Sequence, residues 1–326
     1  MRQLEDCVWV ISKKNFETIY KDATLKMVEK SNEKGLNCKY LFFPHFKFDE
    51  KGQLFYDEQK IDIVPKIAYI RGYDLELIKW LEKNGTYTIN SLEAIENCRD
   101  KIRFHQLIEK TEIKGLNKIK YIKYNDQSYD EIAKLLGKPF IMKDATGSGG
   151  SGVFLASNEG DMEKFKKESK GEILCQEYIT TSKGRDVRFV LVGNKVIGVY
   201  ERINDSDWRS NLALGGHIEI YNPTQEQIKT AEQVSEVLGA ELCAVDFMFG
   251  KEGELLLCEA NSNPALLDFY LPSIKMVDSI FDFIKEKLKN LEKQNGNLLT
   301  KYNDHIKCIP IFCNKHHFII FADSMI

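Results

Sequence analysis

Residues 242–261, LCAVDFMFGKEGELLLCEAN, decide the fold of this chain. Two apolar runs flank a short polar segment, and Gly253 suits the second position of a two-residue hairpin turn, which requires a positive φ. If Glu252 and Gly253 form that turn, antiparallel pairing places Asp246 opposite Glu259 and puts Asn261 on the same face.

Two carboxylates in direct opposition among apolar residues are destabilising unless something neutralises them. A divalent cation would do so, and oxygen ligands such as those of Asp246, Glu259 and Asn261 suit Mg²⁺. The alternative is a solvent-facing pair of acids at the ends of the two strands.

Length and composition limit the number of domains, the class of partner and the cellular compartment that can be expected. A chain of 326 residues exceeds one ordinary core and predicts two or three domains. The net charge of −3 shows no basic excess, so a nucleic-acid partner is not expected. No apolar run reaches the length of a membrane span, and the acidic start lacks the basic region of a signal peptide. The eight cysteines show no CxxC spacing, which favours a reducing cytoplasm over a disulfide framework.

Residues 1–98 alternate between predicted strands and predicted helices, which indicates an open, mostly parallel α/β sheet. Strands are expected at residues 7–12, 38–43, 67–71 and 87–90, helices at 16–34 and 74–83, and a β-hairpin excursion at 49–61. Ligands bind beyond the carboxyl ends of such strands. Arg71 ends one strand and could hold an anionic substrate there, whereas a structural or solvated arginine is the more ordinary reading.

The order of expected strands and helices predicts two α+β units, at residues 99–178 and 179–296. In the first, strands at 140–143 and 153–156 flank a glycine-rich segment. In the second, strands at 186–192 and 196–202 precede a loop over 204–216, and a capping box at Thr224 opens a helix. The hairpin follows, and then an amphipathic helix is expected at 274–291.

Residues 297–326 form an apolar tail of unassigned role, β-like from residue 301. Its Cys308, Cys313, His316 and His317 could bind Zn²⁺, but their spacing fits no familiar zinc pattern. An edge strand, a partner contact or a disordered tail is preferred.

The glycine-rich segment Gly147-Ser-Gly-Gly-Ser-Gly152 matches GxGxxG only formally. A dinucleotide site needs a helix directly after the glycines, and here a predicted strand follows. The segment therefore predicts a hairpin flap whose bare amides, those of Gly149 and Gly150 included, close over nucleotide phosphates. A flexible hairpin tip is the alternative. Lys101 and Lys143 could reach the phosphates as point charges, although each alone would more ordinarily be a surface lysine.

Residues 99–270 resemble the catalytic core of the ATP-grasp superfamily, and most closely its RimK-like branch of carboxylate–amine ligases. The N-terminal unit also resembles the family's first domain, through Arg71-Gly72 and Ile89-Asn90-Ser91. The motifs that carry the main resemblance are Asp100-Lys-Ile-Arg103, Pro139-Phe-Ile-Met-Lys143, Ile173-Leu-Cys-Gln-Glu-Tyr-Ile179, Asp186-Val-Arg188, Glu201-Arg202, Arg209-Ser-Asn-Leu212, Gly215-Gly216, Val245-Asp246 and Glu259-Ala-Asn261.

The resemblance implies an ATP-grasp fold, with an N-terminal α/β domain and two α+β subdomains that clamp ATP. It implies phosphate contacts from Lys101 and Lys143 and a ribose contact from Asp186. Adenine would be held by Gln176, Glu177, Tyr178 and Ile179, with Glu177 at the exocyclic amine. It also implies catalytic roles for Arg188, Arg202 and Arg209, a nucleotide contact from Asn211, and two Mg²⁺ ions, with Mn²⁺ as an alternative, on Asp246, Glu259 and Asn261.

The implied reaction is the ATP-dependent joining of a carboxylate and an amine through an acyl phosphate. The amine would be a small molecule such as an amino acid, and the acceptor an amino acid, peptide or protein carboxylate. Two segments depart from the usual pattern of the RimK group. Leu214 stands where that group usually has a basic residue, and Ser262-Asn263-Pro264-Ala265 stands where it usually has Ser-Pro-Gly. Addition of glutamate to a ribosomal protein is therefore not carried over to this chain. The alternatives are a phosphotransferase and a non-catalytic nucleotide-binding partner protein, and homo-oligomerisation stays open.

Overall fold

The computed structural model describes residues 3–12, 21–147, 152–269 and 271–303, and the chain divides into two compact units, Met1–Lys285 and Glu286–Ile326. Gly149, Gly150 and the cysteines and histidines of the tail lie outside the described residues. The description below concerns the first unit, except that the last helix begins in the first unit and continues into the second. No helix in the described ranges is both long and apolar enough to cross a membrane.

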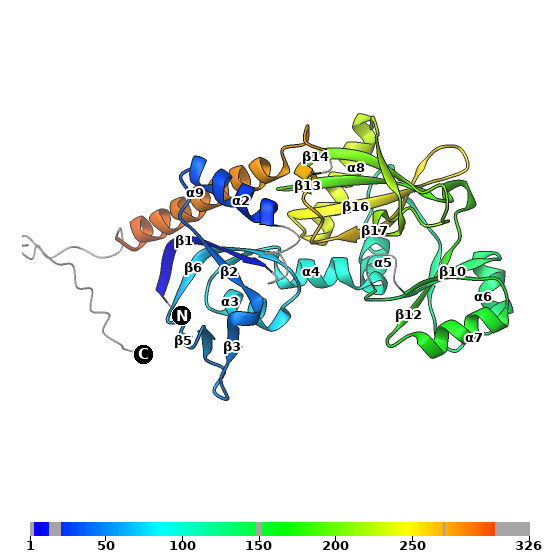
Figure 1. The fold of residues 1–326 in the computed structure, drawn as a ribbon, viewed down its shortest axis with the longest axis horizontal. Coiled ribbons are helices and arrows are strands. Elements are labelled where there is room, and N and C mark those ends of the chain that lie inside the picture. The colour runs from blue at the N-terminus through cyan, green and yellow to red at the C-terminus, as the bar shows by residue number, and fades with distance from the viewer. Residues whose placement is uncertain (1–2, 13–20, 148–151, 270, 304–326) are drawn as a thin grey trace, which may run out of the picture. The chain divides into compact units, whose positions relative to one another are not determined.

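The first sheet is parallel throughout, as the α/β alternation predicts. Its order is β2 (Cys38–Phe42), β1 (Gln3–Ser12), β6 (Ile63–Arg71) and β7 (Tyr87–Ile89) (Figure 1). Helix α3 (Leu75–Lys83) buries Leu77, Ile78 and Leu81 in a core shared with Trp9 and Ile11. Helix α2 (Lys21–Glu33) follows β1, and Ser91 caps α4 (Leu92–Arg99) by accepting from the amide of Ala94.

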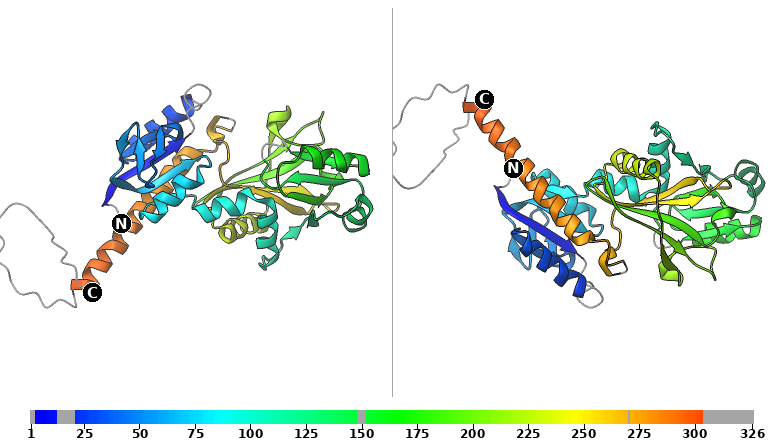
Figure 2. Two further views of the ribbon diagram at one scale, coloured as in Figure 1. Left: turned by 90° about the horizontal axis from the view of Figure 1, so that it is seen from below. Right: turned by 90° about the horizontal axis from the view of Figure 1, so that it is seen from above.

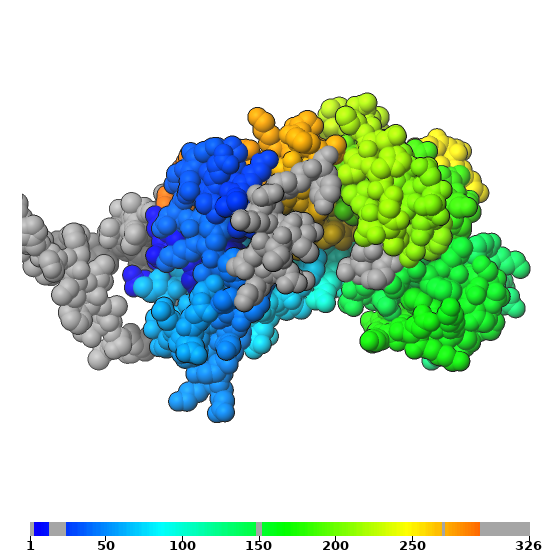
Figure 3. Space-filling model, in the orientation of Figure 1, coloured from blue at the N-terminus to red at the C-terminus, as the bar shows by residue number. Residues whose placement is uncertain are grey.

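The predicted β-hairpin excursion is a three-stranded antiparallel sheet of β3 (Phe46–Phe48), β4 (Leu54–Tyr56) and β5 (Gln59–Lys60). It stands out from the surface in blue at the lower edge of Figure 3. The sequence missed the third strand because Asp57 and Glu58, with φ of 46° and 67°, form a turn without glycine. A positive φ is uncommon for residues other than glycine.

A smaller antiparallel sheet follows, in the order β11 (Val153–Ala156), β10 (Phe140–Asp144), β12 (Ile173–Glu177) and β9 (Tyr121–Lys123). Helices α6 (Tyr129–Leu136) and α7 (Glu159–Glu168) bury their apolar faces against it. The antiparallel pairing of β10 with β11 confirms the two strands predicted on either side of the glycine-rich segment.

The third sheet has six strands, in the order β15 (His217–Ile220), β14 (Lys195–Ile203), β13 (Arg185–Val192), β16 (Leu242–Phe249), β17 (Leu255–Asn261) and β8 (Asn117–Lys118). One face packs Phe189 and Phe247 against α8 (Gln225–Leu238) and against Phe104 of α5 (Lys101–Glu109). Figure 2 shows these two helices, yellow-green and cyan, side by side against the sheet. Thus α5 and β8 contact this sheet, although they lie within the predicted 99–178 unit.

The hairpin confirms the predicted pair and corrects the predicted turn. Asp246 pairs with Glu259, but Phe247 pairs with Leu257, so Cys258 is an extra residue in β17. The connection is the longer loop 250–254, closed by the amide of Gly250 on the carbonyl of Glu254 at 2.8 Å, and not a two-residue turn. The β-bulge absorbs the difference of one residue, and therefore the predicted opposition of the two acids survives a wrong turn.

The last helix is also longer than the sequence predicts. Helix α9 spans Met276–Asn303, so the β-like reading of residues 301–303 is wrong. The segment beyond residue 291 contains good helix formers and no proline, and its one glycine is tolerated in a helix at a modest cost.

Candidate functional site

Two adjoining cavities lie on the polar face of the six-stranded sheet. The first lies where this face meets the smaller sheet, and the second is lined by residues of α4, β17 and the loop after β14. The two cavities share five lining residues, which are Lys101, Gly147, Arg202, Asn211 and Glu259. A molecule in one cavity can therefore meet a molecule in the other at these side chains.

A network of charges connects the two cavities: Arg202 lines both, Asp186 the first and Arg188 the second, whereas Asp246 lines neither. Asp246 is 1% exposed and accepts from Arg188 Nε at 2.6 Å and from Arg202 Nη2 at 2.9 Å. Arg202 also donates through Nε to Asp186 at 2.7 Å. The sequence predicted a cation to neutralise Asp246, and in the structure two guanidinium groups do so. Two of the three catalytic candidates, Arg188 and Arg202, are thus brought together with the ribose candidate Asp186. The third, Arg209, lies on a separate loop.

The two buried aspartates differ in their ionisation. Burial opposes the charge of Asp246, but attraction to Arg188 and Arg202 outweighs it and lowers the pKa of this carboxyl. Burial raises the pKa of Asp186, the attraction to Arg202 opposes that shift, and the negative charge of Asp246 adds to it. Asp246 is therefore the firmly ionised member of the pair.

Glu259 and Asn261 provide the other oxygen atoms predicted to bind metal. Glu259 lines both cavities, and no ion pair of Glu259 occurs within the described residues. Asn261 lines the second cavity and accepts through Oδ1 from Tyr73 Oη at 3.3 Å and from the amide of Asn263 at 2.9 Å.

These three residues fit a hard cation by their chemistry, since they supply two carboxylates and an amide oxygen from paired strands. The described part of the chain holds no cluster of three or more His, Cys, Asp and Glu side chains placed for a metal. Such a cation would have to share Asp246 with the two arginines.

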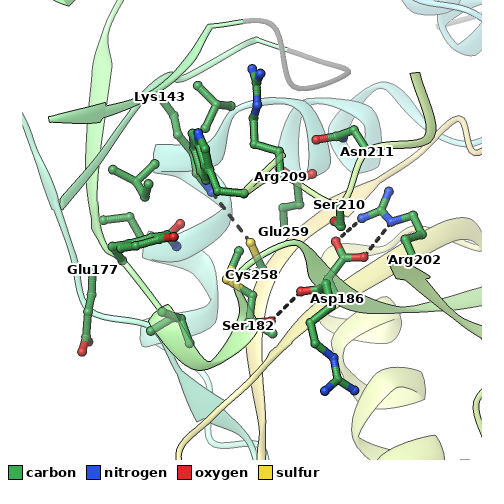
Figure 4. A pocket seen from close by; sticks show the side chains of 18 of the residues that line it. Lys143, Glu177, Ser182, Asp186, Arg202, Arg209, Ser210, Asn211, Cys258 and Glu259 are labelled. Carbon is green, nitrogen blue, oxygen red and sulfur yellow. Dashed lines mark hydrogen bonds and ion pairs between the residues drawn. The ribbon is translucent and has the colours of Figure 1, made fainter. Parts of the chain in front are cut away.

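Both predicted phosphate-binding lysines line the first cavity and are buried. Lys143 points its amine toward the thiol of Cys258, at 3.7 Å (Figure 4). Lys101 opens α5, where Asp100 is the N-cap, and donates to the carbonyl of Gly147. Burial lowers the pKa of Lys101, while the charge of Glu259 opposes that shift.

Residues 176–179 form one wall of the first cavity, as predicted for the adenine contacts. Gln176 lies 3.2 Å from His105 Nε2, and Tyr178 packs edge-on against Trp208, with ring centroids 5.9 Å apart. The apolar side chains that line the same cavity are Ile141, Val153 and Met248. This combination suits a flat aromatic ligand with polar edges.

His105 yields a prediction for the pH dependence of stability. Burial, reinforced by Lys143 and Lys101, lowers the pKa of His105 from 6.5 to about 3. The unfolded chain therefore binds one more proton than the folded chain between these values, so stability is lost as pH falls below 6.5. This loss reaches up to about 1.4 kcal/mol per pH unit. Urea unfolding of wild type and His105→Gln from pH 7 to pH 5 measures it. Equal slopes in the two proteins would contradict the assignment.

The loop after β14 carries Arg209 and Asn211. Arg209 lines the first cavity and pairs with Asp207 through Nη2 at 2.8 Å, and Asn211 lines both cavities. Asp207 therefore competes with any ligand for the guanidinium of Arg209.

Gly184 holds this loop in place and yields a second prediction. Its φ is +71°, and a Cβ atom there would lie 2.5 Å from the backbone carbonyl oxygen of Asn204. Gly184→Ala is expected to destabilise the fold by about 1–3 kcal/mol and to displace the loop. The control is Gly171→Ala, where a Cβ atom meets nothing within 4 Å and φ is ordinary. Denaturant unfolding compares the two, and similar stabilities would refute the role given to Gly184.

Several cavity residues carried no assignment from the sequence. Trp208, Cys258, Arg99 and Tyr73 line the cavities, and they come from four separate segments. The sequence could have indicated two of them, because Trp208 precedes the catalytic candidate Arg209 and Arg99 precedes the motif that begins at Asp100. Arg71, by contrast, donates to Tyr69 Oη at 2.8 Å and to the carbonyl of Pro264, and it lines neither cavity. These contacts support the structural reading of Arg71.

Comparison with known proteins decides the family. The model of the RimK-like ATP-grasp domain matches residues 98–284. The chain belongs to the RimK-like ATP-grasp family. This is a family of carbon–nitrogen ligases, and solved ATP-grasp ligases share the fold described above. The resemblance read from the sequence is therefore confirmed.

A curated relative and two solved structures show what this chain is similar to. A protein of Vibrio parahaemolyticus named probable alpha-L-glutamate ligase is 35% identical over 234 residues, which cover 70% of this chain and 77% of the relative. The ATP-grasp ligase PsnB, solved with a minimal precursor, Mg and ADP, superposes with a TM-score of 0.64 at 17% identity, over 88% of this chain and 100% of that chain. D-alanine–D-alanine ligase from Bacillus anthracis superposes with a TM-score of 0.64 at 15% identity, over 89% of this chain and all of the ligase.

Proposed function

We propose that this RimK-like ATP-grasp protein is an ATP-dependent carboxylate–amine ligase that forms an amide through an acyl phosphate. The observation that carries this proposal is the junction of two cavities at Lys101, Arg202, Asn211 and Glu259. A nucleotide in the first cavity and an acid in the second would meet at these residues. The solved relative with Mg and ADP supports the same pair of ligands here.

In the first step, the substrate carboxylate attacks the γ-phosphorus of ATP, and the acyl phosphate and ADP form. Lys101 and Lys143 attract the phosphate oxygens, and Arg202 balances charge at the transferred group. Arg209 joins them after leaving Asp207. When bound on Asp246, Glu259 and Asn261, magnesium would supply further positive charge at the phosphoryl oxygens. Two ions, and Mn²⁺ as a substitute, remain part of the proposal.

In the second step, the amine nitrogen attacks the acyl carbon, the carbon–oxygen bond to phosphate breaks, and an amide, phosphate and a proton are released. The amine is proposed to be L-glutamate, because curated relatives carry the name of alpha-L-glutamate ligase. The acceptor is proposed to be a peptide or protein carboxylate, a class supported by the precursor bound to PsnB. The chain needs no covalent nucleophile of its own for either step.

The proposal also assigns the parts of the chain. Residues 1–98 would form the first domain, 99–178 the subdomain with the flap, 179–296 the subdomain with the metal residues, and 297–326 a tail without an assigned role. Gly149 and Gly150 would close over the phosphates. A monomer and a homo-oligomer are both compatible with this assignment.

The test incubates the purified chain with ATP, Mg²⁺, L-glutamate and a panel of acids and short peptides. Mass spectrometry is expected to find an amide conjugate in amounts that match the ADP and phosphate released. Omission of either the acid or the amine should abolish ADP release. An isolable phosphoester would instead establish a phosphotransferase, and nucleotide binding without any product would establish a non-catalytic protein.

A further inference from the structure

The second cavity has an excess of positive charge at its wall. Among the described residues, four cationic side chains and one carboxylate, that of Glu259, line it. Arg188 and Arg202 are already bound by buried aspartates, and Lys101 belongs to both cavities and donates to Gly147. Arg99 differs from these three, because no carboxylate among the described residues lies within ion-pair distance of its guanidinium.

Arg99 is held at the cavity by an aromatic ring. Its guanidinium carbon lies over the ring of Tyr73, 5.2 Å from the centroid. The hydroxyl of the same ring donates to Asn261 Oδ1 at 3.3 Å. Tyr73 therefore contacts both Arg99 and Asn261, one of the predicted metal residues.

A guanidinium over an aromatic face keeps its edge open, and that edge matches a carboxylate with two parallel hydrogen bonds. The second cavity holds about 390 Å³, which lies within the range of about 300–1,000 Å³ for small-molecule sites. An arginine that is exposed, has no ionic partner in the part of the chain that the structure describes and faces such a cavity suits an anionic ligand. The reacting carboxylate belongs at Glu259 and Lys101, where the two cavities join, so the group at Arg99 is a different one.

We propose that Arg99 binds a non-reacting carboxylate of a substrate in the second cavity and so selects carboxylate-bearing substrates over neutral ones. This inference rests on the proposed ligase function and deepens it. The carboxylate can come from the amine substrate, as the α- or γ-carboxylate of an acidic amino acid, or from the acceptor, as a second carboxylate of a peptide. Arg99 is a specificity-determining residue in this role.

The first experiment measures the KM of each substrate in Arg99→Gln and Arg99→Lys. In Arg99→Gln the KM of the carboxylate-bearing substrate is expected to rise about tenfold or more, because a charge-assisted contact of about 1.5–3 kcal/mol is lost. The KM of ATP should not change, and Arg99→Lys should recover part of the loss. A rise for L-glutamate assigns the carboxylate to the amine substrate, and a rise for the acceptor assigns it to the acceptor.

The second experiment exchanges the carboxylate for an amide. L-glutamine carries an amide in place of the γ-carboxylate of L-glutamate, and L-isoglutamine carries one in place of the α-carboxylate. Acceptor peptides with and without a second free carboxylate test the acceptor as the source of the bound group. In wild type, the amide at the recognised position should weaken binding by about the same factor as the Arg99→Gln substitution. In Arg99→Gln the same exchange should have little further effect, because the partner of that group is already gone.

The matched control is Arg103→Gln. Arg103 lies four residues further on, binds Glu96 at 2.7 Å and Asn97 at 2.7 Å, and lines neither cavity. Its KM values should equal those of wild type. Melting temperatures of all variants show whether a change in KM reflects loss of fold, since a structural role of Arg99 on Tyr73 would lower the melting temperature without a preference between carboxylate and amide.

The outcomes separate this inference from the proposed function. If wild type forms an amide but Arg99→Gln keeps both KM values, or suffers the same amide penalty as wild type, the inference alone is overturned. If no amide forms, saturation-transfer NMR with L-glutamate and a non-hydrolysable ATP analogue decides. Binding that Arg99→Gln loses would keep the inference and overturn the ligase function, and absence of binding would overturn both.

Discussion

Glu259→Gln is expected to keep the fold and to lower the rate of ATP turnover by roughly 10³-fold. The substitution preserves the shape of the side chain and removes one negative charge. Glu259 lines both cavities and has no ionic partner among the described residues, so its charge is free to bind a cation between nucleotide and acid. Because no buried ion pair is broken, stability should change by less than about 1 kcal/mol.

The measurement is the rate of ADP release at saturating ATP over a range of Mg²⁺ concentrations, with the melting temperature as the check on folding. Glu252→Gln is the matched control, since it makes the same change at the exposed tip of the same hairpin. The control should turn over at the wild-type rate. Near-normal turnover of Glu259→Gln would reject the assignment of the metal site.

Asp246→Asn is expected to lower the free energy of unfolding by about 3 kcal/mol or more. Asp246 is the shared acceptor of Arg188 and Arg202, and it is buried behind these two cavity-lining arginines. Among the described residues, a neutral amide in its place leaves Arg188 without the carboxylate that it binds and leaves Arg202 with the carboxyl group of Asp186 alone. An uncompensated buried charge is costly, whereas an exposed ion pair contributes little.

Urea unfolding at pH 7 provides the measurement, with Asp282→Asn as the control. Asp282 pairs with Lys34 at 2.6 Å but its side chain is 66% exposed, so its loss should cost less than about 1 kcal/mol. The double variant Arg188→Gln/Asp246→Asn should be less destabilised than the sum of its parts, because the two charges are lost together. Equal losses for Asp246→Asn and Asp282→Asn would show that the network contributes no more than a surface pair.

The two substitutions act on residues that are paired in register, yet they address different properties. Asp246 is buried below the cavities and organises two arginines, and its main effect is on stability. Glu259 faces the cavities, and its main effect is on catalysis. The β-bulge at Cys258 explains part of this difference, because it lets Cys258 and Glu259, neighbours in the sequence, both line the first cavity.

The sequence by itself determined the features that arise from local pattern. The parallel sheet of the N-terminal unit and the caps at Ser91 and Thr224 follow from periodicity and capping chemistry over a few residues. The motifs of the RimK-like family follow in the same way, because each is a short run of residues. The opposition of Asp246 to Glu259 was predicted from a two-residue turn that is wrong, and it holds because the β-bulge at Cys258 offsets the longer loop. Local pattern failed at Asp57 and Glu58 and at the hairpin loop, where the turn departs from the commonest types.

Only the tertiary structure decided which charges meet. Asp246 takes its partners from β13 and β14, and Arg99, Tyr73 and Asn261 come together from segments that are far apart in the sequence. Helix α5 and strand β8 join the six-stranded sheet for the same reason. Such contacts depend on the packing of whole elements against one another, and the spacing of residues within one element carries no information about them.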